Sequence, residues 1–159
     1  MSDLKFNCAL IHVFDLEGGL SEDPDDPGGV TKYGISQRQY PTLDIRNLTM
    51  QDATDIYYRD YWLASFIDLI DDGVLCKIVF AAMANVGVTR AIKLLQNACN
   101  LLGAKLDEDG IIGPQTSTWI NKFRHHNALI MSFKYNMAKF YFSLKKPKYI
   151  VGWLKRLEE

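Results

Sequence analysis

Apolar residues recur every three or four positions along most of this chain, which is the period of a helix that packs one face against a core. The first such stretch predicts a helix over residues 3–16. Ser2 or Asp3 caps its start, and Gly18 or Gly19 ends it. The chain therefore opens with an amphipathic helix that stops at a pair of glycines.

The segment after this helix has a different pattern. Leu20–Val30 is too rich in Gly, Pro and Asp for regular structure, so it predicts a loop. Lys32–Ser36 predicts a short strand or turn that lays Thr31, Tyr33 and Ser36 along one side of a cleft. We expect this loop to be the irregular part of an otherwise helical chain.

Helical periodicity returns in the remaining two thirds of the sequence, punctuated by capping residues, prolines and glycines. The predicted elements are short helices after Ser36 or Pro41, a helix opened by a capping box at Thr49–Asp52 and running to about Phe66, a buried helix over 74–86, helical spacing from Ala91 to a C-cap at Gly103, a helix from Pro114 to about Phe123, a helix over 128–144, and a last helix after Pro147 that ends near Arg156.

No linker, repeat or low-complexity tract divides these elements, and 159 residues is a common size for one domain. The fold class is therefore predicted to be mainly α, as a single helical domain with a Gly/Pro/Asp-rich loop.

The composition excludes several classes of protein. No stretch approaches the roughly 18 to 20 apolar residues of a membrane span, and Asp3 and Lys5 interrupt the start where a signal peptide needs a basic region followed by an apolar run. Cys8, Cys76 and Cys99 are an odd number set among apolar residues, so they are interpreted as reduced core thiols. We expect a chain made in the cytoplasm without a signal peptide.

Histidine spacing gives no support for a metal site. His125 and His126 are adjacent, His12 stands alone, and no Cys-x-x-Cys or His-Glu-x-x-His spacing occurs. We therefore expect neither a metal nor an organic cofactor.

Charge is balanced overall but distributed unevenly. Residues 1–75 carry 5 basic and 14 acidic side chains, residues 76–119 carry 4 and 3, and residues 120–159 carry 9 and 2. A basic C-terminal part could steer the protein onto an anionic surface such as a bacterial envelope. The alternative is that these charges only solvate helix faces.

Glu17, at the end of the first helix, is the strongest candidate for chemistry. The negative end of the helix dipole and any burial disfavour ionisation of a carboxyl there, and a protonated carboxyl is a candidate general acid. Asp26 lies nine positions on, across a loop that can fold back, and two carboxyls facing one bond are the equipment of a glycoside hydrolase. Asp23 and Asp25 compete for the second role, and the glycines and prolines also suit an ordinary C-cap and turn.

The run Glu17–Ser36 resembles the signature of the glycoside hydrolase family 108 muramidases, which occur in bacteriophage endolysins and related bacterial cell-wall hydrolases. The resemblance implies that Glu17 is the catalytic acid. Phage-type lysozymes are similar in a looser way, with a Glu, an Asp about nine residues later and then a Thr. Glu17, Asp26 and Thr31 fall close to that spacing, with the last interval one residue short.

The second half of the chain carries its own resemblance. Asn85-Val86-Gly87, Leu95-Gln96, Asp109–Thr116 and Gly152–Arg156 are similar to the segment identified in this family as a predicted peptidoglycan-binding domain. The resemblance implies a catalytic muramidase segment over 1–90 and a peptidoglycan-binding segment over 91–159, packed into one lysozyme-like domain.

The family implies a substrate and a mechanism. The bond is the β-1,4 linkage from N-acetylmuramic acid to N-acetylglucosamine in peptidoglycan, and Glu17 protonates its leaving oxygen. Asp26 either stabilises the positive charge on the sugar or acts as base on a water that Thr31 holds. Carboxyl separation decides between retention and inversion, and a threonine suited to orienting water favours inversion.

Sugar binding requires flat apolar faces and amide partners. From the aromatic candidates we select Tyr33 and Trp62, although aromatic side chains at helical spacing also suit a core. Ser36 lies on the same predicted cleft side. Asn85 sits in an apolar helix, where its amide needs either a structural partner or a substrate acetamido group.

The expected partners follow from this interpretation. They are peptidoglycan glycan strands, without nucleic acid or stable membrane insertion. We expect a monomer that reaches the cell wall or periplasm through a holin, if it is a phage endolysin, or through an exporter. Two other classes stay open: a non-catalytic cell-wall-binding or secretion accessory protein, and a helical nucleic-acid binder supported only by the basic C-terminal part.

Overall fold

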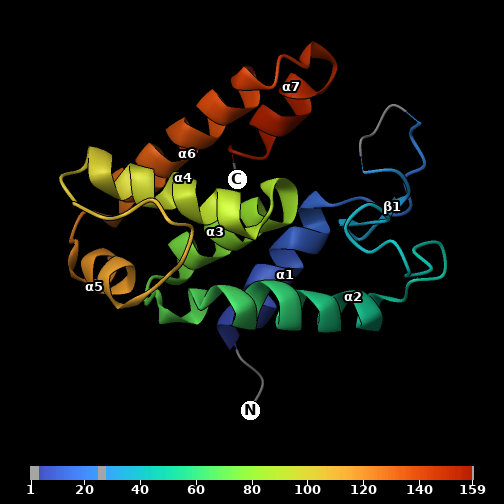
Figure 1. The fold of residues 1–159 in the computed structure, drawn as a ribbon, viewed down its shortest axis with the longest axis horizontal. Helices are drawn as coiled ribbons and strands as arrows, with labels where there is room; N and C mark the ends of the chain where they lie inside the picture. The colour runs from blue at the N-terminus through green and yellow to red at the C-terminus, as the bar shows by residue number, and fades with distance from the viewer. Residues whose placement is uncertain (1–3, 25–27, 159) are drawn as a thin grey trace.

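Two long helices from different parts of the chain form the centre of the molecule. The computed structural model describes residues 4–24 and 28–158, and within them α1 (Leu4–Leu16) packs along α3 (Gly73–Val86). α3 in turn packs on α4 (Val88–Leu101), which contacts α6 (His126–Ser143) (Figure 1). This arrangement confirms the prediction of a mainly helical single domain.

Most helices begin or end at the capping residues, prolines and glycines that the sequence predicts. Thr49 caps α2 (Met50–Ile56) with the predicted capping box, in which its hydroxyl accepts from the Asp52 N–H and the Asp52 carboxylate accepts from the Thr49 N–H. Two further helices begin at prolines as expected: α5 (Pro114–Lys122) and α7 (Pro147–Lys155). Local capping chemistry therefore defines these ends.

One sequence-based expectation about these boundaries needs correction. Residues 37–48 form turns and not short helices, because the Gln37 side chain donates to the carbonyls of Tyr40, Pro41 and Leu43 and holds a compact loop. Gly87, at φ 87°, separates α3 from α4. The proposed caps Ser2 and Asp3 lie outside the described residues.

α2 continues into two irregular helical turns that enter the core. A π-helical segment, η1 (Tyr57–Leu63), follows α2 directly, and a short 3₁₀ turn, η2 (Ile67–Leu69), comes after it. Phe66 between them adopts a left-handed conformation with φ 56°. The predicted end of this helix at Phe66 is confirmed.

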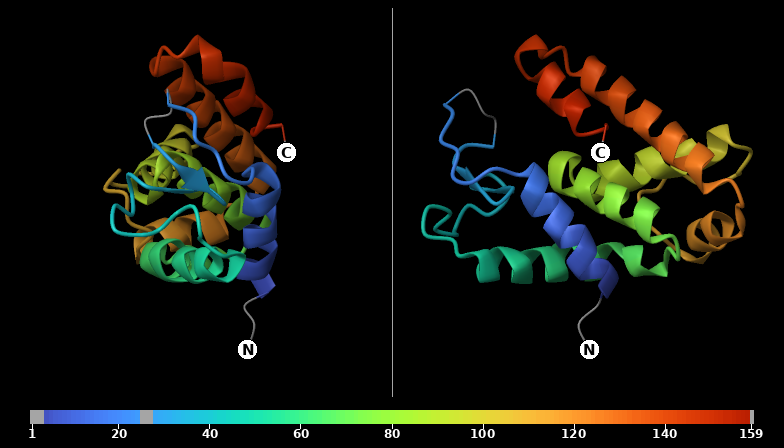
Figure 2. Two further views of the ribbon diagram at one scale, coloured as in Figure 1. Left: turned by 90° about the vertical axis from the view of Figure 1, so that its right-hand side faces the viewer. Right: turned by 180° about the vertical axis from the view of Figure 1, so that it is seen from behind.

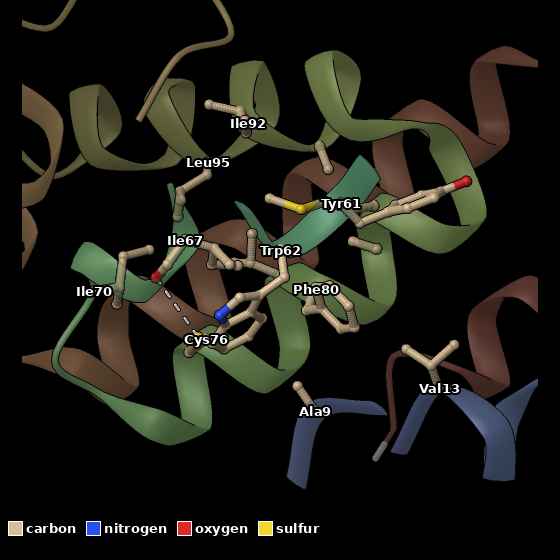
Figure 3. Close-up of a cluster of buried hydrophobic side chains, with 14 of the residues drawn as sticks. Ala9, Val13, Tyr61, Trp62, Ile67, Ile70, Cys76, Phe80, Ile92 and Leu95 are labelled. Carbon is tan, nitrogen blue, oxygen red and sulfur yellow. Dashed lines mark hydrogen bonds between the residues drawn. The ribbon is translucent and has the colours of Figure 1, made fainter. Parts of the chain in front are cut away.

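Trp62 lies inside the hydrophobic core and not at a surface. Its side chain is 1% exposed and packs among Ile67, Ile70, Cys76 and Phe80, with the Trp62 and Phe80 ring centroids 5.4 Å apart (Figure 3). The prediction that Trp62 binds sugar is therefore wrong. Burying this large apolar ring in the core stabilises the fold, and a buried indole face has no access to a ligand.

Two of the three cysteines are core thiols as predicted. Cys76 and Cys99 are buried, and burial raises the pKa of the Cys99 thiol to about 12. Cys8 is exposed, contrary to the prediction. The buried stripe of α1 consists of Phe6, Ala9, Leu10 and Val13, and Cys8 falls outside that helical face.

A small hairpin follows the segment predicted as a loop, Leu20–Val30, which we call the acidic loop. β1 (Thr31–Lys32) pairs antiparallel with β2 (Ile35–Ser36), and the turn residues Tyr33 and Gly34 both have positive φ, at 52° and 78°. This is the geometry of a type I′ turn. The predicted strand or turn over Lys32–Ser36 is confirmed.

The last two helices run antiparallel to each other (Figures 1 and 2). α7 folds back along α6, so that α7 and the β1–β2 hairpin face each other on the same side of the molecule (Figures 1 and 2). No residue of α7 is fully buried. Among residues 4–24 and 28–158, no helix has the length and apolar character needed to cross a membrane.

Candidate active site

Glu17 is held at the end of α1 by the helix itself. Its N–H donates to the Val13 carbonyl at 2.8 Å, which extends the last helical turn by one residue before Gly18 and Gly19. The Glu17 side chain is only 15% exposed, and its Oε1 pairs with Nη1 of Arg156, whose side chain is 28% exposed. A glutamate at a helix end thus meets a guanidinium from the far end of the chain.

The hairpin turn lies directly against the stem of Glu17. A Cβ at Gly34 would meet the Tyr57 hydroxyl and would lie 2.9 Å from Cγ of Glu17. The Tyr57 hydroxyl donates to the Tyr33 carbonyl at 3.0 Å, which ties the turn to η1. Gly34 is therefore required both by its positive φ and by this close approach.

Two buried tyrosines flank Glu17 and stay protonated. Burial raises the pKa of Tyr57 well above its ordinary value, and the neighbouring Tyr61 and Glu17 raise it further. Burial likewise raises the pKa of Tyr141 to about 12. Both hydroxyls therefore remain hydrogen-bond donors at neutral pH.

The Glu17 side chain lines a cleft of about 530 Å³ that is built from both halves of the chain. One wall comes from the loop and hairpin, and the other from α3, α6 and α7. Its lining residues are Glu17, Gly28, Thr31, Gly34, Ser36, Gln39, Ala84, Asn85, Val86, Phe140, Tyr141, Leu144, Lys146, Tyr149, Trp153 and Arg156.

Three aromatic rings from α6 and α7 stack along this cleft. The Trp153 ring stacks with both Tyr141 and Tyr149, with centroid distances of 5.3 Å and 5.7 Å and interplanar angles of 27° and 23°. This stack is not among the features predicted from the sequence. The signal that could have found it is the four-residue spacing of Tyr149 and Trp153, which places both rings on one helix face.

Four of the residues predicted to form the site line the cleft. Thr31, Ser36 and Asn85 line it together with Glu17. The side-chain amide oxygen of Asn85 accepts a 2.8 Å hydrogen bond from the Tyr141 hydroxyl, so Asn85 has a structural partner at the cleft wall. The Thr31 hydroxyl donates to the Gly29 carbonyl at 3.3 Å, and the Ser36 hydroxyl donates to Gln39 at 3.2 Å.

The other predicted site residues lie elsewhere. Tyr33 packs its half-buried ring on Phe14, 5.8 Å away between centroids, and is not part of the cleft lining. Trp62 is in the core, as described above. Asp26 lies outside the described residues. Among the residues that are described, no three His, Cys, Asp or Glu side chains are grouped to hold a metal ion.

Opposite charges face each other across the cleft. Besides the Glu17–Arg156 pair, the Lys148 ammonium lies 3.5 Å from the Asp23 carboxylate, which joins the first turn of α7 to the acidic loop. At these two pairs, basic side chains from the C-terminal part of the chain attract acidic side chains from its N-terminal part, which holds α7 near the acidic loop.

Comparison with known proteins divides the chain just after α3, so both matched segments contribute residues to the cleft. Residues 10–87 match the family described as glycosyl hydrolase 108, and residues 90–158 match a family described as "Predicted Peptidoglycan domain". Among solved structures, 11 chains match. One is SagA from Brucella abortus, at 28% sequence identity and a TM-score of 0.80, covering 96% of this chain and 89% of that one. No protein with a curated description matches. The predicted lysozyme-like fold is confirmed.

Proposed function

Because the chain belongs to the glycosyl hydrolase 108 family, we propose that it cleaves the β-1,4 bond between N-acetylmuramic acid and N-acetylglucosamine in peptidoglycan, with Glu17 as general acid. Membership of the family and the peptidoglycan domain support the coarser statement, that the protein is a glycoside hydrolase of the bacterial cell wall. The identity of the cleaved bond and the role of Glu17 as general acid are what we propose beyond that statement.

The observation that carries the proposal is the position of Glu17. Of the described carboxyl groups it is the one that lines the cleft, and it is largely shielded from solvent. A partly buried carboxyl in a groove able to hold a sugar strand is the arrangement that glycoside hydrolysis requires.

The chemistry follows from the charge that develops on the sugar. Glu17 gives a proton to the leaving glycosidic oxygen while the anomeric carbon becomes positive. We retain the expectation that Asp26 stabilises this charge or activates a water, and that Thr31, which lines the same cleft, orients that water. Inversion of the anomeric configuration remains our expectation for this arrangement.

The remaining cleft residues suit an acetylated sugar. Ser36 and Gln39 present hydroxyl and amide groups on the hairpin side, and Asn85 and the Trp153 stack present an amide and apolar ring surface on the other. We also propose that the protein reaches the cell wall from the cytoplasm. A phage endolysin would pass through a holin, and a bacterial enzyme through an exporter.

The new chain ends made from purified sacculi test this function. A muramidase leaves reducing N-acetylmuramic acid, which borohydride converts to muramicitol. We expect muramicitol to appear in proportion to the loss of turbidity. Glucosaminitol would instead indicate a glucosaminidase, an anhydro end without reducing power would indicate a transglycosylase, and no new end at all would indicate a non-catalytic wall-binding protein; each of these results contradicts the proposal.

A further inference from the structure

The pairing of Glu17 with Arg156 conflicts with a simple acid mechanism. A general acid must carry a proton to give away, whereas the Glu17 carboxyl is engaged as the anionic partner of a guanidinium. Both side chains are largely withdrawn from water, so bulk solvent screens the pair only in part. Glu17 therefore has to leave Arg156 before it can act.

Arg156 sits on the part of the molecule best able to release it. It directly follows α7, a helix with no fully buried residue that packs mainly on α6. α7 is joined to the opposite cleft wall by the ion pairs Glu17–Arg156 and Asp23–Lys148. A small shift of α7 along α6 would separate Arg156 from Glu17, and the α7 side chains that pack against the core, Ile150 and Trp153, are only partly buried.

A neutral sugar strand cannot take Glu17's place. Pulling Glu17 away would leave a half-buried guanidinium without its anion, which is unfavourable. A carboxylate on the incoming substrate removes that obstacle, because one ion pair replaces another, and the planar guanidinium fork matches any carboxylate equally well. Peptidoglycan carries such carboxylates on its peptide stems, and on the lactyl group once a stem has been removed.

We propose that Arg156 is the binding site for a carboxylate of the peptidoglycan substrate, and that this exchange frees Glu17 for catalysis. The inference rests on the proposed function. Arg156 keeps its own protons throughout. The released Glu17 takes a proton from solvent and gives it to the glycosidic oxygen as the C–O bond breaks. A water then adds to the anomeric carbon and returns one proton to solvent.

Lys146 marks the direction in which the anionic part of the substrate extends. It lines the same cleft and lies at the opposite end of α7, about 15 Å from Arg156 by the rise of ten helical residues. The cleft wall contributed by α7 is therefore cationic at both ends and aromatic between them, at Tyr149 and Trp153. A sugar strand that carries anionic substituents complements this wall.

The test compares sacculi whose carboxyl groups are charged with sacculi whose carboxyl groups are neutralised. Native sacculi are set against the same material with its carboxyl groups converted to neutral amides by carbodiimide and methylamine. For the unaltered protein we expect kcat/KM to be about tenfold higher on native than on amidated sacculi. For Arg156→Gln we expect the two values to agree within about twofold. Arg156→Lys keeps a cation and should retain part of the preference.

The control separates this exchange from general attraction to an anionic wall. Lys155→Gln removes the same charge from the neighbouring, exposed position, which does not line the cleft, so it should keep the full preference. Equal rates of the unaltered protein on both substrates would overturn the inference whether or not any variant folds. So would a full preference retained by Arg156→Gln.

Two further arms complete the design. Sacculi stripped by an amidase keep only the lactyl carboxylate; rates like those on native material assign the exchange to that group, and low rates assign it to the peptide stem. If the unaltered protein makes no muramic reducing ends from any substrate, the proposed function fails, which differs from equal hydrolysis of all of them.

Discussion

Glu17→Gln is expected to lower the rate of glycan hydrolysis by about 10³-fold while the protein keeps its fold. The carboxamide has nearly the same shape as the carboxyl, and it can still accept a hydrogen bond from Arg156. It cannot transfer a proton to the glycosidic oxygen, and loss of a positioned general acid costs typically 10²- to 10⁴-fold. The rate is measured as release of reducing ends from sacculi, and the fold by far-UV circular dichroism and thermal unfolding.

The matched control is the same substitution five residues away. Glu22 forms an ion pair with Arg46 at an exposed position and does not line the cleft. Exposed pairs contribute little to stability, so Glu22→Gln should stay close to the unaltered protein in rate and stability. If Glu17→Gln and Glu22→Gln had the same activity, Glu17 would not be the acid.

Gly34→Ala is expected to damage both stability and catalysis. The residue has φ 78°, which an L side chain adopts only with strain, and the new Cβ would press on the Tyr57 hydroxyl and on Cγ of Glu17. We expect the free energy of unfolding to fall by about 1–3 kcal/mol. We expect kcat/KM to fall by about 10²-fold, because a displacement of about 1 Å in a catalytic group has that effect.

Gly29→Ala separates backbone strain from displacement of Glu17. Gly29 has a similar φ of 71°, but its Cβ would meet only Cβ of Gln37, at an ordinary 3.9 Å. Urea unfolding should show a loss of stability in both variants, larger in Gly34→Ala because its Cβ also presses on Tyr57 and Glu17, whereas the large loss of activity should be confined to Gly34→Ala. Equal losses of activity would mean that the close approach at Gly34 has no catalytic importance.

Local chemistry explains why much of the fold could be predicted. The capping box at Thr49, the prolines that open α5 and α7, and the stripe of Phe6, Ala9, Leu10 and Val13 each act within one or two helical turns. Glu17 could be selected in the same way, because the helix that precedes it and the two glycines that follow it are its neighbours in the sequence.

The parts that could not be predicted depend on distant partners. Arg156 reaches Glu17 across 139 positions, and no periodicity within α7 indicates that contact. The prediction of a sugar-binding role for Trp62 was wrong because the spacing of aromatic residues shows which of them share a helix face. It does not show whether that face meets the core or solvent. The cleft depends on α6 and α7 folding back toward the hairpin, so the part of its second wall that these two helices contribute could not be predicted from the sequence.

A structure of the Glu17→Gln variant with a peptidoglycan tetrasaccharide tests the central claim most directly. We expect the strand to lie between the hairpin and α7, with a glycosidic oxygen between muramic acid and glucosamine within about 2.6–3.2 Å of the carboxamide at position 17. A strand bound on another face of the molecule, with that carboxamide far from every glycosidic oxygen, would contradict the account.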